Sequence, residues 1–484
     1  MSEKYDVVII GAGIGGLVCG CYLSKAGLKV LIVEQHDKPG GYCTSFTRQG
    51  FNFDVGIHYL GGVKKGLLGK IFKEIGVFNY LKFSQFNPTD IIIMPDKTVE
   101  VMSDIQETIK NFKIAFPGEK TNINKFFELM LRKDFFSLYL KFKKHNFAKL
   151  LDLFFEDAKL KSTIEVLLGN MGISAHRISA ISGVIFFREF IADPGWYPDG
   201  GIQRIPDILV KIIKRNNGKI ILSKKVEKVV IKNRAVKGVI LEGEEFINTN
   251  AVISNADAEE TFSRLVTIGT REEKLLKSMQ VSPSIFCVYL GLENDFGASI
   301  KNPATIWYLS SYNVNKCFDN FYSESIIKGP IKFLSCILPF NHDKSRALKP
   351  TMQLFTGAPF KTKKFWDKER DAFMEMLICK IEEIIPDLRG HIDLKFNSTP
   401  QTFYRYSLNK NGAAFGWAST VELMRRPKVM NITSIKNLFL AGHWCNGGLS
   451  QGGVPQVAVM GRTAARSLIE SLGLNWKYRY NFIT

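Results

Sequence analysis

The sequence predicts an α/β fold in which one parallel-sheet domain is assembled from three separate stretches of the chain. Residues 5–41 read as strand, glycine turn, helix and strand. Short strand-like runs return at residues 219–255, and the chain closes with a further strand, a glycine-rich loop and a helix. Strands that alternate with helices are typical of parallel sheets. The intervening residues therefore belong to a second, discontinuous domain.

The first unit has the features of a dinucleotide-binding turn. An apolar run at residues 6–10 is followed by Gly11, Gly13 and Gly16, then by a helical stretch, a second apolar run and Glu34. Gly11 permits the tight turn, Gly13 lets the backbone approach a pyrophosphate, and Gly16 allows the helix to pack closely on the strand. The free N–H groups and the positive end of the helix would face the phosphates.

The acid at the tip of the second strand narrows the choice of dinucleotide. A carboxylate at Glu34 accepts hydrogen bonds from both ribose hydroxyls and repels a 2′-phosphate, which favours FAD or NAD over NADP. This unit does not separate FAD from NAD. Downstream, Gly40 and Gly41 precede a hairpin-like segment at residues 51–55. Glycine pairs mark places where the backbone passes close to a neighbour, here the rest of the dinucleotide.

Residues 64–195 are predicted to be mainly helical, and they contain a basic, aromatic stretch. Between residues 110 and 161 there are 12 Lys/Arg against 6 Asp/Glu, together with ten Phe. Such a pattern suits an interfacial helix on a membrane, but also a helical subdomain with a Phe-rich core and a solvated basic face. The whole chain has a formal net charge of +19, which indicates an acidic partner surface. No nucleic-acid module is apparent, so an anionic lipid surface is favoured.

The middle of the chain predicts a return to the first domain and then a new sheet. A turn at 196–201 leads to a helix at 205–214 and strands at 219–222, 226–231, 236–241 and 251–255. Strands at 286–292 and 333–338 and a helix at 369–385, closed by Pro386, follow. We expect dinucleotide-domain segments at 1–90, 196–285 and 401–484, a helical substrate or membrane-contact region at 91–195, and a substrate-domain sheet at 286–400.

The C-terminal segment offers a second helix end for a cofactor. A strand at 437–441 runs into a turn, a glycine-rich loop extends to Gly453, and a helical pattern covers 456–472. Pro455 fits the first helical turn, where its missing N–H costs nothing. A helix N-terminus preceded by glycines is again suited to negative charge.

Composition excludes several other classes. Eight cysteines are scattered without a Cys-x-x-Cys pair, and no histidines have metal-ligand spacing, so we expect reduced, mostly buried thiols and no metal site. A mean hydropathy of −0.01 without a long apolar run argues against a transmembrane helix, and the N-terminus shows no secretion signal. We expect a cytoplasmic protein associated peripherally with membrane.

Taken together, the glycine regions resemble those of the FAD-dependent phytoene desaturase-like enzymes, which include carotenoid desaturases, carotenoid isomerases and retinol saturases. The similar segments are 34–41, 50–59, 198–201, 254–257 and 438–461. The resemblance implies a Rossmann-like FAD-binding domain of the glutathione-reductase and amine-oxidase type. It also implies that Gly11, Gly13, Gly16 and Glu34 hold the ADP half of FAD, and that Gly40 and Gly41 pass near the pyrophosphate and the flavin. By the same likeness the strand around Val226 lies beside the adenine, and FAD is contacted along the ribitol and isoalloxazine by Gly442, Gly453, Val454 and Pro455. His443 stands where many members have an acid.

The same resemblance implies desaturation, saturation or cis-trans isomerisation of a long apolar isoprenoid, with hydride transfer at flavin N5. His58, Tyr59 and Arg405 are the candidates for proton transfer or substrate binding; the alternative explanation for each is a packed aromatic pair or a structural ion pair. Three alternatives remain open: a polyunsaturated fatty-acid isomerase, a flavin amine oxidase-like enzyme, and a lipid carrier without catalysis.

Overall fold

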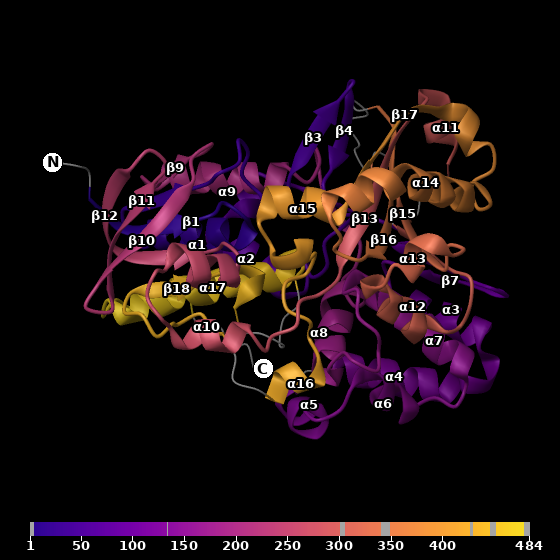
Figure 1. Cartoon of the computed structure of the whole chain (residues 1–484). Helices are drawn as coiled ribbons and strands as arrows, with labels where there is room; N and C mark the ends of the chain where they lie inside the picture. Colours follow the sequence, from indigo (N-terminus) through magenta and orange to yellow (C-terminus); the bar gives the residue numbers. More distant parts are fainter. Residues whose placement is uncertain are drawn as a thin grey trace.

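The protein is built around two seven-stranded sheets (Figure 1). The computed structural model describes residues 4–132, 134–300, 305–339, 349–425, 429–445 and 452–478. The first sheet has the order β10-β11-β12-β1-β2-β9, with β18 also paired to β12. Its strands are β1 (Tyr5–Ile10), β2 (Val30–Val33), β9 (Lys219–Ile221), β10 (Val226–Lys232), β11 (Ala235–Leu241), β12 (Glu245–Ser254) and β18 (Leu438–Leu440).

Pairing within the first sheet joins stretches that are far apart in the sequence. β1 lies between β2 and β12, all parallel, and β9 and β18 extend the parallel set on either side. β12 is long enough to pair antiparallel with β11 through its first residues and parallel with β1 through its last. The prediction that the chain returns to its first sheet is confirmed.

The helices on this sheet come from both ends of the chain. α1 (Ile14–Lys25) packs against α9 (Arg204–Arg215) and α17 (Val454–Ser471), and α17 also contacts α2 (Leu67–Ile75). α1 and α17 approach so closely that a Cβ added at Gly461 would lie 2.3 Å from the Gly15 carbonyl oxygen. The C-terminal helix is thus held against the first helix by backbone contact at a glycine.

The second sheet is mixed and has the order β17-β13-β16-β15-β14-β6-β7. Its strands are β6 (Asp90–Met94), β7 (Lys97–Val101), β13 (Ser284–Leu292), β14 (Thr305–Leu309), β15 (Phe333–Ile337), β16 (Thr351–Ala358) and β17 (Ile392–Ser398), and only β6 and β14 pair in parallel. Two short antiparallel pairs lie outside the large sheets: β3 (Ser45–Arg48) with β4 (Phe51–Asp54), and β5 (Phe83–Gln85) with β8 (Trp196–Pro198). The helices from residue 271 to residue 425 are α10 (Arg271–Leu276), α11 (Asn294–Ser299), α12 (Val314–Asp319), α13 (Ser325–Lys328), α14 (Lys363–Glu382), α15 (Pro400–Ser407) and α16 (Val421–Arg425).

The prediction that residues 64–195 are mainly helical is wrong for their first part. Strands β5, β6 and β7 occupy this part, and β6 and β7 complete the second sheet. Both are short runs rich in β-branched residues, joined by the Pro95-Asp96 turn, which is a strand signal. From Ile105 the stretch is helical: α3 (Ile105–Ala115), α4 (Lys120–Leu131), α5 (Phe135–Phe142), α6 (Phe147–Asp152), α7 (Ala158–Val166) and α8 (Ala180–Phe190).

Most of the phenylalanines in the basic stretch are core residues. Of the ten, seven are at most 2% exposed, Phe135 and Phe154 are half-buried, and Phe136 is 53% exposed. Burial in the helical subdomain therefore accounts for the aromatic richness. The exposed large apolar side chains that remain in this stretch are Leu131, Phe136 and Leu140 at and around α5, with Ile114 and Leu153 standing singly elsewhere. No helix among the described residues is long and apolar enough to cross a bilayer. Seven of the cysteines are buried and free, and Cys379 is exposed.

The contact between α1 and α17 gives the first testable prediction. Gly461→Ala places a methyl group against the Gly15 carbonyl, so we expect the free energy of unfolding to fall by about 1 to 3 kcal/mol. Gly118→Ala is the matched control, because an added Cβ there meets nothing within 4 Å, and it is expected to change stability by less than about 0.5 kcal/mol. Chemical denaturation of both variants measures the difference; equal stabilities would contradict this packing.

Candidate functional site

Four parallel strands of the first sheet end at the same edge, and the residue types expected at a nucleotide site follow them. Gly11 follows β1, Glu34 follows β2, Asn255 follows β12, and Gly442 comes two residues after β18. The carboxyl ends of parallel strands are where open α/β sheets bind ligands. All four residues line one pocket, which we call the strand-end pocket.

The strand-end pocket gathers most of the predicted cofactor residues. Its lining includes Gly11, Gly13, Glu34, Gly40, Gly41, Val226, Gly442, Gly453 and Val454. Gly16 and Pro455 do not line it. Gly16 packs instead on the turn behind the pocket, where an added Cβ would lie 2.3 Å from the Gly11 carbonyl oxygen, and Pro455 lies in the first turn of α17.

The glycine turn presents uncapped backbone N–H groups to the pocket. Gly11 has a φ of +91°, and its N–H donates to the Val33 carbonyl at 2.8 Å. Gly13 is the N-cap of α1, where no side chain caps the helix. Helix N-termini that lack a side-chain cap leave backbone donors for an anion. This end of α1 is suited to a phosphate.

The Glu34 carboxylate is fixed by two backbone donors. Its Oε2 accepts from Ala12 N–H at 2.6 Å, and its Oε1 accepts from His36 N–H at 2.9 Å. Each carboxylate oxygen can accept a second hydrogen bond, so the group is oriented for hydroxyl donors in the pocket. Across the same turn, Gly40 N–H donates to the Ala12 carbonyl at 2.8 Å. The first turn, the acid and the Gly40–Gly41 pair therefore form one connected wall.

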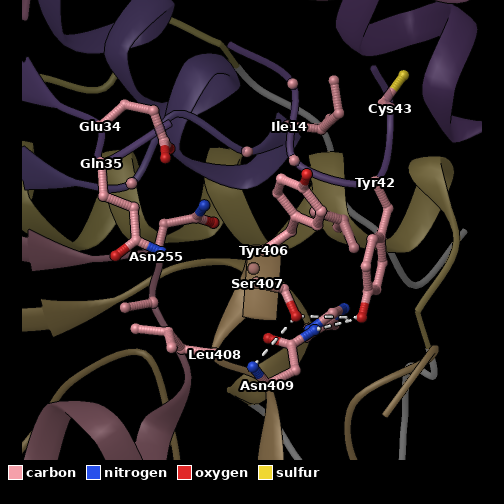
Figure 2. A pocket seen from close by; sticks show the side chains of 18 of the residues that line it. Ile14, Glu34, Gln35, Tyr42, Cys43, Asn255, Tyr406, Ser407, Leu408 and Asn409 are labelled. Atoms are coloured by element: carbon pink, nitrogen blue, oxygen red, sulfur yellow. Dashed lines mark hydrogen bonds between the residues drawn. The ribbon is translucent and has the colours of Figure 1, made fainter. Parts of the chain in front are cut away.

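Asn255 is a site residue that was not predicted. An added Cβ at Gly13, Gly15 or Gly442 would lie 2.8, 2.5 or 2.6 Å from atoms of the Asn255 amide, which fills the space where three segments meet. Figure 2 shows this amide beside Glu34 at one end of the pocket. A polar residue directly after a buried parallel strand was the available signal, and the resemblance already covered residues 254–257.

The opposite wall is a network of uncharged polar groups (Figure 2). The Tyr42 hydroxyl donates to the Ala413 carbonyl at 3.1 Å, lies 3.2 Å from the Ser407 hydroxyl and accepts from Asn409 Nδ2 at 3.2 Å. Asn409 Oδ1 accepts from Trp444 Nε1 at 3.0 Å. Burial raises the pKa of Tyr42 to about 12, so the phenol stays neutral. These contacts hold the wall rigid without placing a charge on it.

His443 also faces the pocket as a neutral group. Burial lowers the pKa of its imidazole to about 4, so the ring carries one donor and one acceptor at neutral pH. It lies against the Trp444 ring, with ring centroids 5.1 Å apart. This residue can hydrogen-bond a bound group but does not add a charge there.

The predicted acid–base pair lies directly behind the pocket wall. Gly56 and Ile57 line the pocket, whereas His58 and Tyr59 point to the second sheet. His58 Nε2 lies 2.8 Å from Asn170 Oδ1, and burial lowers the pKa of His58 to about 4. The Tyr59 hydroxyl donates to the Asp90 carboxyl at 3.2 Å.

Asp90 is a second buried group that was not predicted. It is fully buried, and besides Tyr59 it accepts from Trp307 Nε1 at 2.7 Å and from the Thr89 hydroxyl at 3.0 Å. Burial raises the pKa of Asp90 to about 6, although these donors lower it in part. Asp90 begins a strand in a stretch that was predicted to be helical, so no pattern brought it near Tyr59.

Arg405 lies on the outer side of the pocket. Its side chain is exposed, and the guanidinium carbon is 5.7 Å from the centre of the Tyr406 ring. Tyr406 lines the pocket, and Arg405 does not. Arg405 is therefore next to a lining residue in the sequence but does not itself line the pocket.

The donor set fits a dinucleotide. The glycine turn and the N-terminus of α1 suit phosphates, Glu34 suits ribose hydroxyls, and Gly453 precedes α17 at a second helix N-terminus on the pocket wall. Glycine at positions 13 and 442 leaves room for the Asn255 amide at the pocket wall. No group of three His, Cys, Asp or Glu side chains among the described residues could hold a metal ion.

Comparison with known proteins identifies the class. The chain matches the family of flavin containing amine oxidoreductases over residues 14–469 and belongs to it. It is therefore a flavin-dependent oxidoreductase, and its two-sheet fold is that of this family.

Named relatives extend over nearly the whole chain. It is 24% identical to rat (Rattus norvegicus) all-trans-retinol 13,14-reductase, with 91% of this chain and 82% of the relative covered. It is 25% identical to the Methylomonas 4,4′-diapophytoene desaturase (99% and 98% covered) and 26% identical to the chloroplastic prolycopene isomerase of Daucus carota (98% and 82% covered). An oxidoreductase structure from Methanosarcina mazei superposes with a TM-score of 0.68 at 18% identity (96% and 100% covered), and putrescine oxidase with putrescine bound has a TM-score of 0.63 at 15% identity (97% and 100% covered).

Glu34 provides a test of the pocket. In Glu34→Gln one oxygen becomes an NH₂ group, which faces the N–H of Ala12 or His36 and leaves that donor unpaired. We expect the flavin dissociation constant to rise by about tenfold or more, since a donor is misplaced and the carboxylate is lost. Fluorescence of released flavin on titration measures this constant. Exposed Glu470→Gln is the control and should retain wild-type affinity.

Asp90 provides a pH-dependent prediction. Its pKa is raised from 3.8 to about 6 in the fold, so its contribution to stability is fully present below the unfolded pKa and is lost as pH rises through about 6. Between pH 5 and pH 8 the wild type should lose about 1 to 2 kcal/mol of unfolding free energy that Asp90→Asn does not lose. Denaturation at both pH values measures the difference. Exposed Asp393→Asn should follow the wild type, and an identical pH dependence in Asp90→Asn would rule out the raised pKa.

Proposed function

We propose that this protein is an FAD-dependent oxidoreductase acting on carbon–carbon bonds of a long apolar isoprenoid, such as a carotenoid or retinoid. The observation that carries the proposal is the set of relatives: a retinol reductase, a diapophytoene desaturase and a prolycopene isomerase each align over nine-tenths or more of the chain. Their reactions differ in direction, but their named substrates are all isoprenoids with conjugated or conjugatable double bonds.

In this proposal the strand-end pocket holds FAD. Gly11, Gly13 and the N-terminus of α1 bind the pyrophosphate, and Glu34 binds the adenosine ribose. Val226 lies beside the adenine. Gly40, Gly41, Gly442, Gly453 and Val454 lie along the ribitol and the isoalloxazine, with Gly16 and Pro455 shaping the two helix ends from behind. When bound, the cofactor supplies hydride transfer at N5.

The apolar part of the pocket supports a hydrocarbon substrate. Ile57, Ile285, Phe403, Phe415 and Val457 line it. Among the described lining residues the cations are Lys224, Lys225 and Arg264, which precede β10 or lie at 260–265. The two lysines precede Val226, and residues 260–265 contact β10, so these cations lie at the end of the pocket proposed for the adenosine. A fatty-acid carboxylate would need a cationic anchor at the flavin end, and the exposed Arg405 does not line the pocket.

For proton transfer we propose His58 and Tyr59, which do not line the strand-end pocket but directly follow its lining residues Gly56 and Ile57. Forming a double bond removes a hydride from one carbon and a proton from its neighbour, saturation reverses both, and isomerisation leaves no net change. Neutral His58 can accept or donate this proton while Asn170 orients its ring, and Asp90 holds the Tyr59 hydroxyl. The Asn170 amide contacts His58, and the Asp90 carboxyl, which also accepts from the Trp307 indole, contacts Tyr59. These contacts hold His58 and Tyr59 in place.

The proposal includes peripheral contact with a membrane. A long isoprenoid resides in a bilayer, and the net charge of +19 favours an anionic surface. The exposed apolar residues that could make this contact are considered below.

Anaerobic flavin absorbance tests the function. Retinoids, carotenoids and saturated precursors are added in liposomes to the oxidised and to the chemically reduced enzyme. Bleaching by a saturated precursor identifies a desaturase. Reoxidation of the reduced flavin by a polyene identifies a saturase, and conversion with the flavin still reduced identifies an isomerase.

Failure has an equally clear readout. Release of every lipid unchanged in both redox states would make the protein a carrier, and bleaching by an amine but by no lipid would make it an amine oxidase. His58→Ala serves as the matched variant: it should retain flavin yet lower the polyene turnover rate by about 100-fold, as expected for loss of a general acid or base.

A further inference from the structure

We propose that α5 and its approach form the surface on which this protein docks to an anionic lipid bilayer. The surface, which we call the α5 face, consists of the apolar residues Leu131, Phe136 and Leu140 and the basic residues Arg132, Lys141 and Lys144. This inference rests on the proposed function, because a bilayer is where a long isoprenoid substrate resides.

The apolar half of the α5 face is exposed, whereas seven of the ten phenylalanines in residues 110–161 are buried. Phe136 is 53% exposed, Leu140 is 50% exposed and Leu131 is 40% exposed. Phe136 and Leu140 are four residues apart on one helix and therefore share a side of it. The opposite side, Leu138 and Phe142, is buried in the helical core. The helix α5 therefore has apolar side chains both on the side that packs into the protein and on the side that faces solvent.

The basic half surrounds these side chains. Arg132, Lys141 and Lys144 are exposed, and Lys143 is half-buried with its ammonium 5.8 Å from the centre of the Tyr139 ring. Arg425, at the end of α16, adds a further exposed cation by donating to the Lys144 carbonyl at 3.1 Å. Figure 1 shows α16 beside α5. Asp134 is the acidic residue described between 131 and 144, and it is engaged as the N-cap of α5.

This combination selects lipid over other occupants. Lysine and arginine beside exposed Phe and Leu is the pattern of a helix that lies in the headgroup region, with its apolar side chains inserted and its cations on the phosphates. A protein partner would more commonly meet an interface core depleted of lysine. The charge therefore argues for an anionic membrane, and other occupants are outcomes of the test.

The α5 face is attached to the helical subdomain by specific contacts. Arg188 on α8 donates from Nε to the Met130 carbonyl at 2.9 Å and from Nη2 to the Arg132 carbonyl, and its guanidinium carbon lies 5.5 Å from the centre of the Phe135 ring. These bonds fix the end of α4 and the start of α5. The apolar side chains are thus presented on a fixed support.

Vesicle co-sedimentation of the full-length holoenzyme tests the proposal. The probes are phosphatidylcholine vesicles with and without phosphatidylserine. Wild type should bind the anionic vesicles, and Phe136→Glu combined with Leu140→Glu should weaken binding by about tenfold or more, since inserted apolar area is lost and like charge is added. Lys141→Ala combined with Lys144→Ala should weaken it to a similar extent, at about fivefold per basic residue near the surface.

Phe246→Glu is the matched control. Phe246 is 42% exposed on β12, but its neighbours Glu244 and Glu245 are acidic, so this substitution should leave vesicle binding unchanged. Unchanged melting temperatures confirm that the variants fold, as expected for exposed side chains. The docking proposal is overturned if Phe136→Glu/Leu140→Glu binds the vesicles as well as wild type does, or if wild type binds neutral and anionic vesicles equally. It is also overturned if the α5 face binds a second copy of the chain and not lipid.

Turnover of detergent-dispersed polyene separates this inference from the proposed function. If vesicle binding falls while detergent turnover keeps its wild-type rate, the α5 face is a docking surface. If vesicle binding does not depend on the α5 face but turnover persists, only the docking inference fails. Wild type that turns over no polyene in detergent or vesicles refutes the proposed function, whatever the vesicle result.

Discussion

The structure depends on one place where the start of α1, the turn after β18 and the helix α17 pack backbone against backbone at glycines. Gly15 of α1 faces Gly461 of α17 on one side and Gly442 on the other, and the Asn255 amide fills the remaining space. Side chains at these positions would separate the first sheet from its C-terminal strand and helix. The strand-end pocket exists because the carboxyl ends of β1, β2, β12 and β18 are brought to this point together.

Local patterns were sufficient to predict the parts of the site that one segment defines by itself. The glycine turn, Glu34, the strand predicted at 51–55 and the helix predicted from Gln456 each carry a conformational requirement that is visible in the sequence. In the structure they are the turn after β1, the residue after β2, β4 of the β3–β4 hairpin, and α17, which begins two residues earlier at Val454. The predicted helix at 205–214 is α9 within one residue at each end. Nine of the predicted cofactor residues line the strand-end pocket because the first sheet brings the segments that carry them together.

Groups that long-range pairing creates could not be predicted in this way. Asp90 meets Tyr59 and Trp307 only because β6 pairs with β14, a strand more than 200 residues away in the sequence. The Phe-rich stretch posed a different problem, since the same spacing suits a core and a membrane surface. Burial decides it residue by residue: Phe126 and Phe127 are core, and Phe136 is surface.

Three buried carboxyl groups near the pocket and the second sheet are hydrogen-bonded to neutral donors. Asp54 accepts from Ser45 and Tyr197, Asp257 accepts from Lys410 N–H, and Asp90 accepts from three side chains. Burial raises the pKa of each carboxyl to about 6. Each carboxyl group is thus held by neutral donors, which orient the loops around the pocket.

Helix α8 connects the proposed docking surface to the interior. Arg188 holds the start of α5, and two residues further Phe190 packs against Tyr59, with ring centroids 6.2 Å apart. The Phe190 ring also lies 3.4 Å from where a Cβ at Gly453 would be, at the N-terminus of α17. The helix α8 therefore contacts the α5 face through Arg188 and the edge of the pocket through Phe190. The packing of α8 therefore links the position of the α5 face to that of the Gly453 end of α17.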